Sequence, residues 1–203
     1  MVGEGAMVAV QMSEQEARSL ADNTTLWYAA CNSQVHHVLA GDVAAVDALA
    51  ARLKAAGQKA TRLHVTKAFH SGHMGPAADR LEGSGAPGAG PRVPVASNLT
   101  GGWLSEAALG VGTYWKEHML GTVQWRQNCE ELNQKWRPDV IIEVGPGSTL
   151  CSLTGRVLAD TPVPPALLTT MRHPTADADD TSTLLTCLAQ AWAAGVPVDW
   201  PAA

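Results

Sequence analysis

The first 66 residues alternate between short apolar strands and capped helices, and this alternation limits the folds open to the chain more than any other feature. Residues 6–11 form an apolar run that is typical of a strand. Ser13, followed three residues later by Glu16, makes a capping box, which predicts a helix that ends near Ala21. The chain therefore begins with a strand and a helix, each with a clear boundary.

Four further elements complete this pattern. Residues 26–32 and 35–40 predict two strands joined by a tight turn. A helix is expected over residues 42–57, since an aspartate precedes its apolar stripe and a glycine follows it. Residues 59–66 predict the last strand. The predicted order is β-α-β-β-α-β, which is the ferredoxin-like arrangement.

The remainder of the chain also indicates α/β structure. A short helix is expected over residues 71–81, and a longer one over 123–136. One face of the longer helix carries apolar residues at helical spacing and is expected to lie in the core: Trp125, Cys129, Leu132 and Trp136. Residues 140–144 are continuously apolar, which is typical of a strand buried in a parallel sheet.

Length and composition favour a soluble domain, because 203 residues, 46% of them hydrophobic, can bury a substantial core. No apolar run reaches the roughly 20 residues of a membrane helix, and the first residues lack the basic region of a signal peptide. We therefore expect a cytoplasmic protein. The four cysteines are far apart and form no Cys-x-x-Cys pair, so buried free thiols are expected.

The charge is unevenly distributed along the chain. A net charge of −5 argues against general nucleic-acid binding. No carboxylate lies between Asp47 and Asp79, whereas this interval holds five basic residues: Arg52, Lys54, Lys59, Arg62 and Lys67. Such a patch could attract a polyanionic substrate or an acidic partner protein. A solvated basic face is the alternative.

His70 is the candidate for chemistry, because it follows a predicted strand and precedes a predicted helix, where α/β enzymes place functional groups. With His73 it forms a His-x-x-His pair, but a zinc site needs three or four ligands and no suitable glutamate or cysteine pair accompanies it. We therefore predict no metal site. A histidine with a structural role is the alternative that the residues alone leave open.

Five segments, in order, resemble the malonyl-type acyltransferases of polyketide and fatty-acid synthesis. The most specific is Ala68-Phe69-His70-Ser71, which is similar to the Ala-Phe-His-Ser motif of that family. The others are Gly5-Ala6-Met7-Val8-Ala9-Val10, Tyr114-Trp115-Lys116-Glu117-His118 followed by Val123-Gln124-Trp125, Glu143-Val144-Gly145-Pro146-Gly147-Ser148-Thr149-Leu150, and Gly195-Val196-Pro197-Val198-Asp199-Trp200. The resemblance extends over essentially the whole chain.

This resemblance implies a domain organisation. Residues 1–66 would be a ferredoxin-like small subdomain. Residues 67–160 would be the C-terminal part of an α/β-hydrolase-like large subdomain, and residues 161–203 a segment that follows the acyltransferase domain. The implied fold class is therefore α/β, with only the later part of the domain present.

The resemblance also implies roles for individual residues. His70 would be the general base, and the backbone carbonyl of His118 would orient it. Phe69 would narrow the acyl pocket and favour malonyl over methylmalonyl groups, while Lys67 replaces the usual histidine beside the substrate. No cofactor is expected to be bound; the substrate would be malonyl-CoA and the acceptor the phosphopantetheine thiol of an acyl carrier protein.

The nucleophile that such a base needs is missing from the sequence. The family's Gly-x-Ser-x-Gly elbow does not occur in the 203 residues, and Ser71 is on the wrong side of the base. The sequence therefore predicts an incomplete acyltransferase region that works with an acyl carrier protein and flanking polyketide synthase domains. The alternative is a non-catalytic module or pseudoenzyme that docks a carrier protein.

Overall fold

The structure of the protein is a computed structural model that describes residues 2–22, 25–81, 91–106, 108 and 113–202. The chain divides into two compact units, residues 1–128 and 129–203, which we describe separately. This division does not coincide with the boundaries expected at residues 66 and 160, which stay predictions. Within the described parts, no helix combines the length and apolar character needed to cross a membrane.

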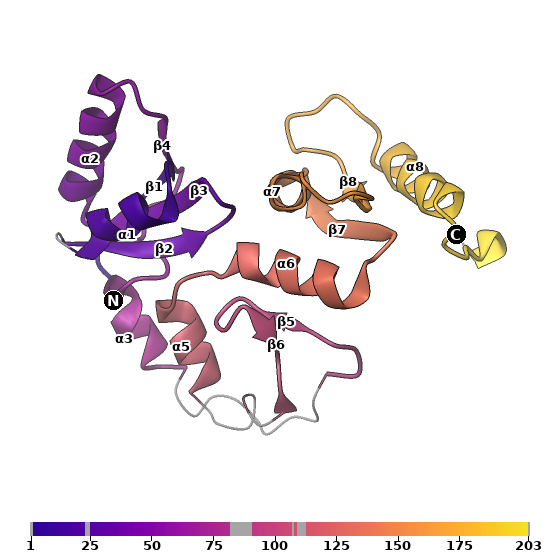
Figure 1. The fold of residues 1–203 in the computed structure, drawn as a ribbon, viewed down its shortest axis with the longest axis horizontal. Coiled ribbons are helices and arrows are strands. Elements are labelled where there is room, and N and C mark those ends of the chain that lie inside the picture. The colour runs from indigo at the N-terminus through magenta and orange to yellow at the C-terminus, as the bar shows by residue number, and fades with distance from the viewer. Residues whose placement is uncertain (1, 23–24, 82–90, 107, 109–112, 203) are drawn as a thin grey trace. The chain divides into compact units, whose positions relative to one another are not determined.

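The first unit begins with the predicted β-α-β-β-α-β order of elements (Figure 1). The elements are β1 (Ala6–Gln11), α1 (Glu14–Asp22), β2 (Leu26–Cys31), β3 (His36–Gly41), α2 (Val43–Ala55) and β4 (Ala60–Arg62). The four strands form one sheet in the order β2-β3-β1-β4, and every neighbouring pair is antiparallel. The capping box is also present, because the Ser13 hydroxyl accepts from the Glu16 amide at 3.3 Å and Glu16 Oε2 accepts from the Ser13 amide at 2.9 Å.

Alternate residues of each strand point to opposite sides of this sheet, and both faces are buried. One face packs on α1 and α2 and contains Val8, Val10, Leu39, Ala17, Val46, Leu49 and Leu53. The opposite face contains Met7, Val38, Ala40 and Ala68, and Val123 packs against it. The second face is the one that supports the candidate site.

The rest of the first unit consists of short elements. They are η1 (Gly72–Met74), α3 (Gly75–Ala78), β5 (Ala96–Ser97), β6 (Gly102–Trp103) and α5 (Tyr114–Leu120). The strand expected over residues 59–66 ends at Arg62, although the chain stays beside β1 through a bond from the Gly5 amide to the Thr66 carbonyl at 3.1 Å. Of the helix expected over residues 71–81, only the short η1 and α3 form.

Helix α6 (Trp125–Trp136) crosses the division between the units, and the second unit follows with β7 (Val140–Pro146), α7 (Thr149–Val157), β8 (Ala166–Met171), α8 (Asp180–Ala193) and η2 (Trp200–Ala202). As predicted, β7 is a parallel strand, paired with β8. The expectation that residues 140–144 are buried on both faces is wrong: Ile142 is 41% and Val144 84% exposed. The physical reason is that β8 is the single strand paired with β7 in the described part of the chain.

The apolar face predicted for α6 is core only in part. Cys129 is buried, but Trp136 is 57% exposed because it ends the helix, just before Pro138. All four cysteines are buried free thiols, as expected. Burial raises the pKa of the Cys129 thiol to about 11, so this group stays protonated at neutral pH.

Candidate functional site

His70 lies in a strained backbone conformation that its neighbours hold in place. Its φ of 57° is in the left-handed region, which costs a non-glycine residue roughly 1–2 kcal/mol. The buried Ser71 hydroxyl donates to the Ala68 carbonyl at 2.6 Å and accepts from the His73 amide at 3.2 Å. These two bonds close a tight turn around His70, so the ring direction is set by the fold.

The turn rests directly on the start of the sheet. Ala68 is fully buried, and a Cβ atom added to Gly5 would come within 2.6 Å of the Ala68 nitrogen. Only glycine permits this approach, which explains the residue that precedes β1. The close contact fixes Phe69 and His70 relative to the strand.

The Gly121 carbonyl orients the His70 ring. Residues 122–123 attach to β2, because the Thr122 hydroxyl donates to the Tyr28 carbonyl at 2.6 Å and the Val123 amide donates to the Ala29 carbonyl at 2.9 Å. The Gly121 oxygen consequently lies 3.1 Å from His70 Nδ1. A carbonyl only accepts, so Nδ1 carries the proton and Nε2 of the neutral ring is left with its lone pair.

The carbonyl beside His70 Nδ1 in this structure is that of Gly121. The role that the resemblance gave to the His118 carbonyl stays a prediction. Gly121 lies three positions further along the chain, after the end of α5. What His118 presents to His70 is its side chain, since the two ring centroids are 6.1 Å apart with their planes at 71°. Sequence reasoning missed Gly121 because its placement depends on the distant pairing of Val123 with β2.

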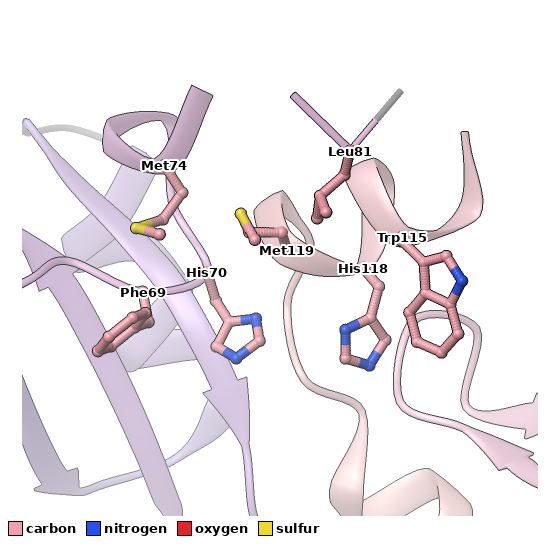
Figure 2. Close-up of a pocket in the computed structure, with 7 residues that line it drawn as sticks. All are labelled: Phe69, His70, Met74, Leu81, Trp115, His118 and Met119. Carbon is pink, nitrogen blue, oxygen red and sulfur yellow. The ribbon is translucent and has the colours of Figure 1, made fainter. Parts of the chain in front are cut away.

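A cavity of about 360 Å³ opens beside the two imidazoles. Figure 2 shows the rings of His70 and His118 next to each other on its border. The other lining side chains are largely apolar: Phe69, Met74, Leu81, Trp115 and Met119. Phe69 is 40% exposed, which is unusual for a phenylalanine and places its ring at the cavity surface.

The His118 ring packs within an aromatic cluster. Its centroid is 5.9 Å from that of Tyr114 and 6.0 Å from that of Trp115. The Tyr114 hydroxyl is in turn hydrogen-bonded to Ser97 Oγ at 2.7 Å in a buried position. Burial, and secondly the neighbouring His70, lower the pKa of His118, so its ring is neutral at neutral pH.

The structure does not bring Lys67 into this cavity. Its ammonium donates to the carbonyls of Val2 and Gly3, at 3.0 and 3.1 Å. The basic patch is also partly neutralised by the fold, since Arg62 Nε lies 2.8 Å from Asp47 Oδ1.

In the described residues, no group of three or more histidines, cysteines and carboxylates could hold a metal ion.

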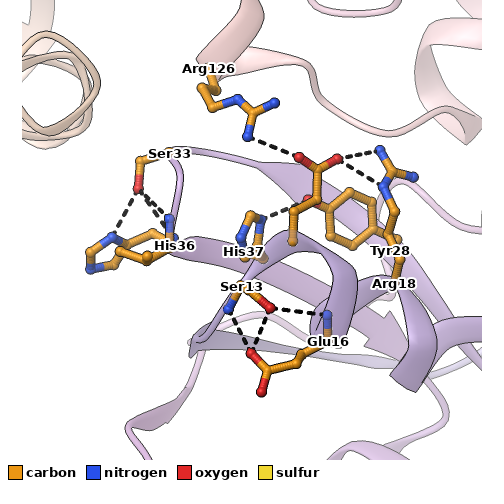
Figure 3. A network of polar contacts seen from close by, with 10 residues as sticks. Ser13, Glu16, Arg18, Tyr28, Ser33, His36, His37 and Arg126 are labelled. Atoms are coloured by element: carbon orange, nitrogen blue, oxygen red, sulfur yellow. Dashed lines mark hydrogen bonds and ion pairs between the residues drawn. The ribbon is translucent and has the colours of Figure 1, made fainter.

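A second polar cluster lies on the helical side of the sheet and was not foreseen from the sequence. His37 is almost completely buried, and its Nδ1 is 2.7 Å from the Tyr28 hydroxyl (Figure 3). The Glu14 carboxylate pairs with Arg18 and Arg126, at 2.8 and 2.9 Å. This cluster ties the start of α6 to α1 within the first unit.

Comparison with known proteins identifies this arrangement. The family described as acyl transferase domain matches residues 1–198. The chain belongs to that family. The resemblance inferred from the motifs is thereby confirmed: this is part of a polyketide synthase acyltransferase domain.

The relatives of this acyltransferase chain are longer than the chain itself. It is 33% identical over 205 residues to a phenolphthiocerol/phthiocerol polyketide synthase of Mycobacterium tuberculosis, and the match covers 97% of the chain but 13% of that protein. The spectinabilin polyketide synthase system protein NorB of Streptomyces orinoci is 33% identical over 211 residues, covering 98% of the chain and 9% of that protein.

Two solved acyltransferase domains have the same fold. The domain of SpnD in complex with 2-(pent-4-yn-1-yl)malonyl matches with a TM-score of 0.87 and 34% identity, covering 95% of this chain and 47% of that one. The domain from the second module of the salinomycin polyketide synthase matches with a TM-score of 0.84 and 36% identity, covering 99% of this chain and 47% of that one. The chain thus spans about half the length of these solved relatives.

Proposed function

We propose that this chain is the later part of an acyltransferase domain in which His70 is the general base. The reaction would move a malonyl-type acyl group from coenzyme A to the phosphopantetheine thiol of an acyl carrier protein. The observation that carries the proposal is the bond between His70 Nδ1 and the Gly121 carbonyl, which leaves Nε2 free to accept a proton beside an apolar cavity.

The chemistry proceeds in two balanced steps. In the first, His70 Nε2 takes the proton of a serine hydroxyl as the serine oxygen attacks the thioester carbonyl, and the proton then passes to the departing coenzyme A thiolate. In the second, His70 deprotonates the carrier thiol, which attacks the acyl-serine and releases the serine oxygen, and the proton returns to that oxygen. A backbone carbonyl that holds the base in one tautomer corresponds to the third member of a serine triad.

In this proposal the serine is supplied by polypeptide outside these 203 residues, since no Gly-x-Ser-x-Gly segment occurs in them. Residues 1–66 then correspond to the ferredoxin-like subdomain, and the segment that follows to part of the hydrolase-like subdomain. The half-length match to the solved domains supports this assignment. The expected partners are an acyl carrier protein and flanking polyketide synthase domains.

Phe69 supports a preference for an acyl group without a bulky α-substituent. Its ring lies at the border of the cavity next to His70. A methyl group that competes with an aromatic ring changes selectivity by about 1–3 kcal/mol, so the proposal is a preference for malonyl over methylmalonyl. Lys67 is proposed to anchor the N-terminal segment through the carbonyls of Val2 and Gly3 rather than to contact substrate.

A hybrid domain tests the proposal. The chain is joined behind the amino-terminal half of the acyltransferase domain from the second salinomycin module, and transfer of radiolabelled malonyl from malonyl-CoA to a carrier protein is measured. Replacing His70 with glutamine should lower the rate by about 100-fold or more, since a positioned general base contributes 10²–10⁴. His173→Gln makes the same change at an exposed position in the second unit and should leave transfer intact.

Two results would refute this function. One is equal transfer by the His70→Gln hybrid and the unmodified hybrid. The other is a stable covalent label on the 203-residue chain incubated alone, which would show that it carries a nucleophile of its own. Binding of a carrier protein without any transfer by the hybrid would favour the docking-module alternative.

A further inference from the structure

The His118 side chain is the second imidazole of the cavity. Of the seven lining residues, His70 and His118 are the two whose rings can both donate and accept a hydrogen bond. His70 Nδ1 already donates to Gly121, whereas in the described part of the chain the ring of His118 has aromatic neighbours and no hydrogen-bond partner. A half-buried imidazole without a partner needs one from a ligand or from water.

The surroundings of His118 define the kind of group it suits. The ring is neutral at neutral pH because burial and the neighbouring His70 lower its pKa. A neutral imidazole offers one N–H donor and one nitrogen acceptor. An amide, which is also neutral and also offers both, matches it better than a carboxylate, which would favour a charged ring. The apolar walls suit the methylene groups on either side of such an amide.

The distance between the rings connects this group to the reaction. In a pantetheine arm, the first amide is separated from the sulfur by two methylene groups. A sulfur that reacts beside His70 therefore brings this amide close to a ring whose centroid is 6.1 Å from that of His70. Coenzyme A and the carrier protein share the pantetheine arm, so one contact serves the donor and the acceptor.

We propose that the His118 imidazole binds the first amide of the pantetheine arm by a hydrogen bond and so positions the thioester sulfur beside His70. This rests on the proposed acyl-transfer function. It gives the ring of His118 a role in substrate binding that is separate from any role of its backbone carbonyl.

The experiment uses the 203-residue chain and a non-reactive probe, the S-methyl thioether of pantetheine. Binding is measured by titration calorimetry and by the imidazole nitrogen signals of the labelled protein. His118→Phe keeps a planar ring but removes the hydrogen bond, and should weaken binding roughly tenfold. His118→Gln restores a donor and an acceptor and should bind within about threefold of the wild type.

The outcomes separate this inference from the proposed function. Equal binding by the wild type and His118→Phe would overturn it, as would a His118→Gln variant as weak as His118→Phe, or a wild type that binds no probe. Unchanged amide exchange in α5 shows that His118→Phe is folded. If transfer by the hybrid domain depends on His70 but probe binding is the same with and without the His118 imidazole, only the inference fails. If probe binding depends on His118 but transfer by the hybrid domain is unchanged by His70→Gln, only the proposed function fails.

Discussion

The two units of the chain bury their strands to very different degrees. In the first unit, Val8 and Leu39 are fully buried, and both faces of the four-stranded sheet are covered. In the second, Val144 of β7 is 84% and Met171 of β8 46% exposed. The difference arises from neighbours, because the strands of both units are rich in apolar residues. A strand suited to the interior is buried only where other elements cover it.

The exposed residues of the second unit are of the kind that a larger sheet would cover. Leu168, Cys187 and Ala191 form a compact core around β8 and α8. The solved relatives are about twice as long as this chain. We therefore expect the first unit to be the more stable one when the 203 residues are studied alone, and the second to open more readily.

The candidate site belongs to the better packed unit. Both His70 and Gly121 are held next to the buried sheet, His70 by the packing of Ala68 and Gly121 by the pairing of Val123 with β2. A strained residue such as His70 keeps its conformation only where the surroundings determine it. The geometry around the base should therefore persist even if the second unit opens.

The largest expected effect comes from a pair of substitutions, one at a buried and one at an exposed strand residue. Leu39→Ala removes a fully buried side chain from the first unit and should lower its free energy of opening by about 2–5 kcal/mol. Val144→Thr alters a side chain that is 84% exposed and should change stability by no more than about 0.5 kcal/mol. Native-state hydrogen exchange of the amides in β1, β3, β7 and β8 reports both units separately.

The comparison between the units would break under two results. One is a large loss from Val144→Thr, which would mean that β7 is covered in solution. The other is protection of the wild-type β7 and β8 amides as strong as that of β1 and β3. Either result would mean that the strands of the second unit are covered as well as those of the first.

Local signals allowed the order of elements over residues 6–62, the first half of the first unit, to be predicted from the sequence. The capping box at Ser13 and the period-two strands report directly on burial and boundaries, and the observed order of elements agrees. Contacts between residues that are far apart in the sequence leave no such local signal. The Gly121 carbonyl reaches His70 only because Val123 pairs with β2, far away in the sequence, and the exposure of Val144 depends on which strands are beside β7.

Within the site, the resemblance supplied what periodicity could not. Phe69, His70 and His118, which the motifs singled out, line one cavity in the structure, while their functional roles stay predictions. Lys67 does not, because its ammonium is held by the N-terminal segment. Met74 and Met119, which no motif singled out, complete the apolar wall. The direction of a side chain is set by its packing. The positions of Lys67, Met74 and Met119 could therefore be found only from the structure.

A smaller effect is expected from acidification of the first unit. Burial lowers the pKa of His37 from its ordinary value of 6.5, with Glu14 and Arg126 among the nearby charges. The unfolded chain therefore takes up a proton at His37 before the folded one does, and the free energy of unfolding should fall as pH drops through about 6.5. His37→Gln keeps a polar partner for the Tyr28 hydroxyl but cannot titrate, so its dependence on pH should be flatter. The free energy of unfolding of both proteins is measured by chemical denaturation between about pH 5 and 8. The same dependence on pH in both would show that His37 is not its cause.

The smallest expected effect comes from helix caps, which both units possess. Ser13 accepts from the Glu16 amide at the start of α1, and Asp179 accepts from the Ser182 amide at the start of α8. Ser13→Ala should lower the stability of the first unit by about 1 kcal/mol, and Asp179→Ala should destabilise the second. Because a cap acts on the first turn alone, both losses should appear whether or not the rest of the unit is well packed. Amide exchange at the start of each helix measures them, and a loss confined to α1 would mean that α8 already frays in the wild type, so that the units differ in local order as well as in packing.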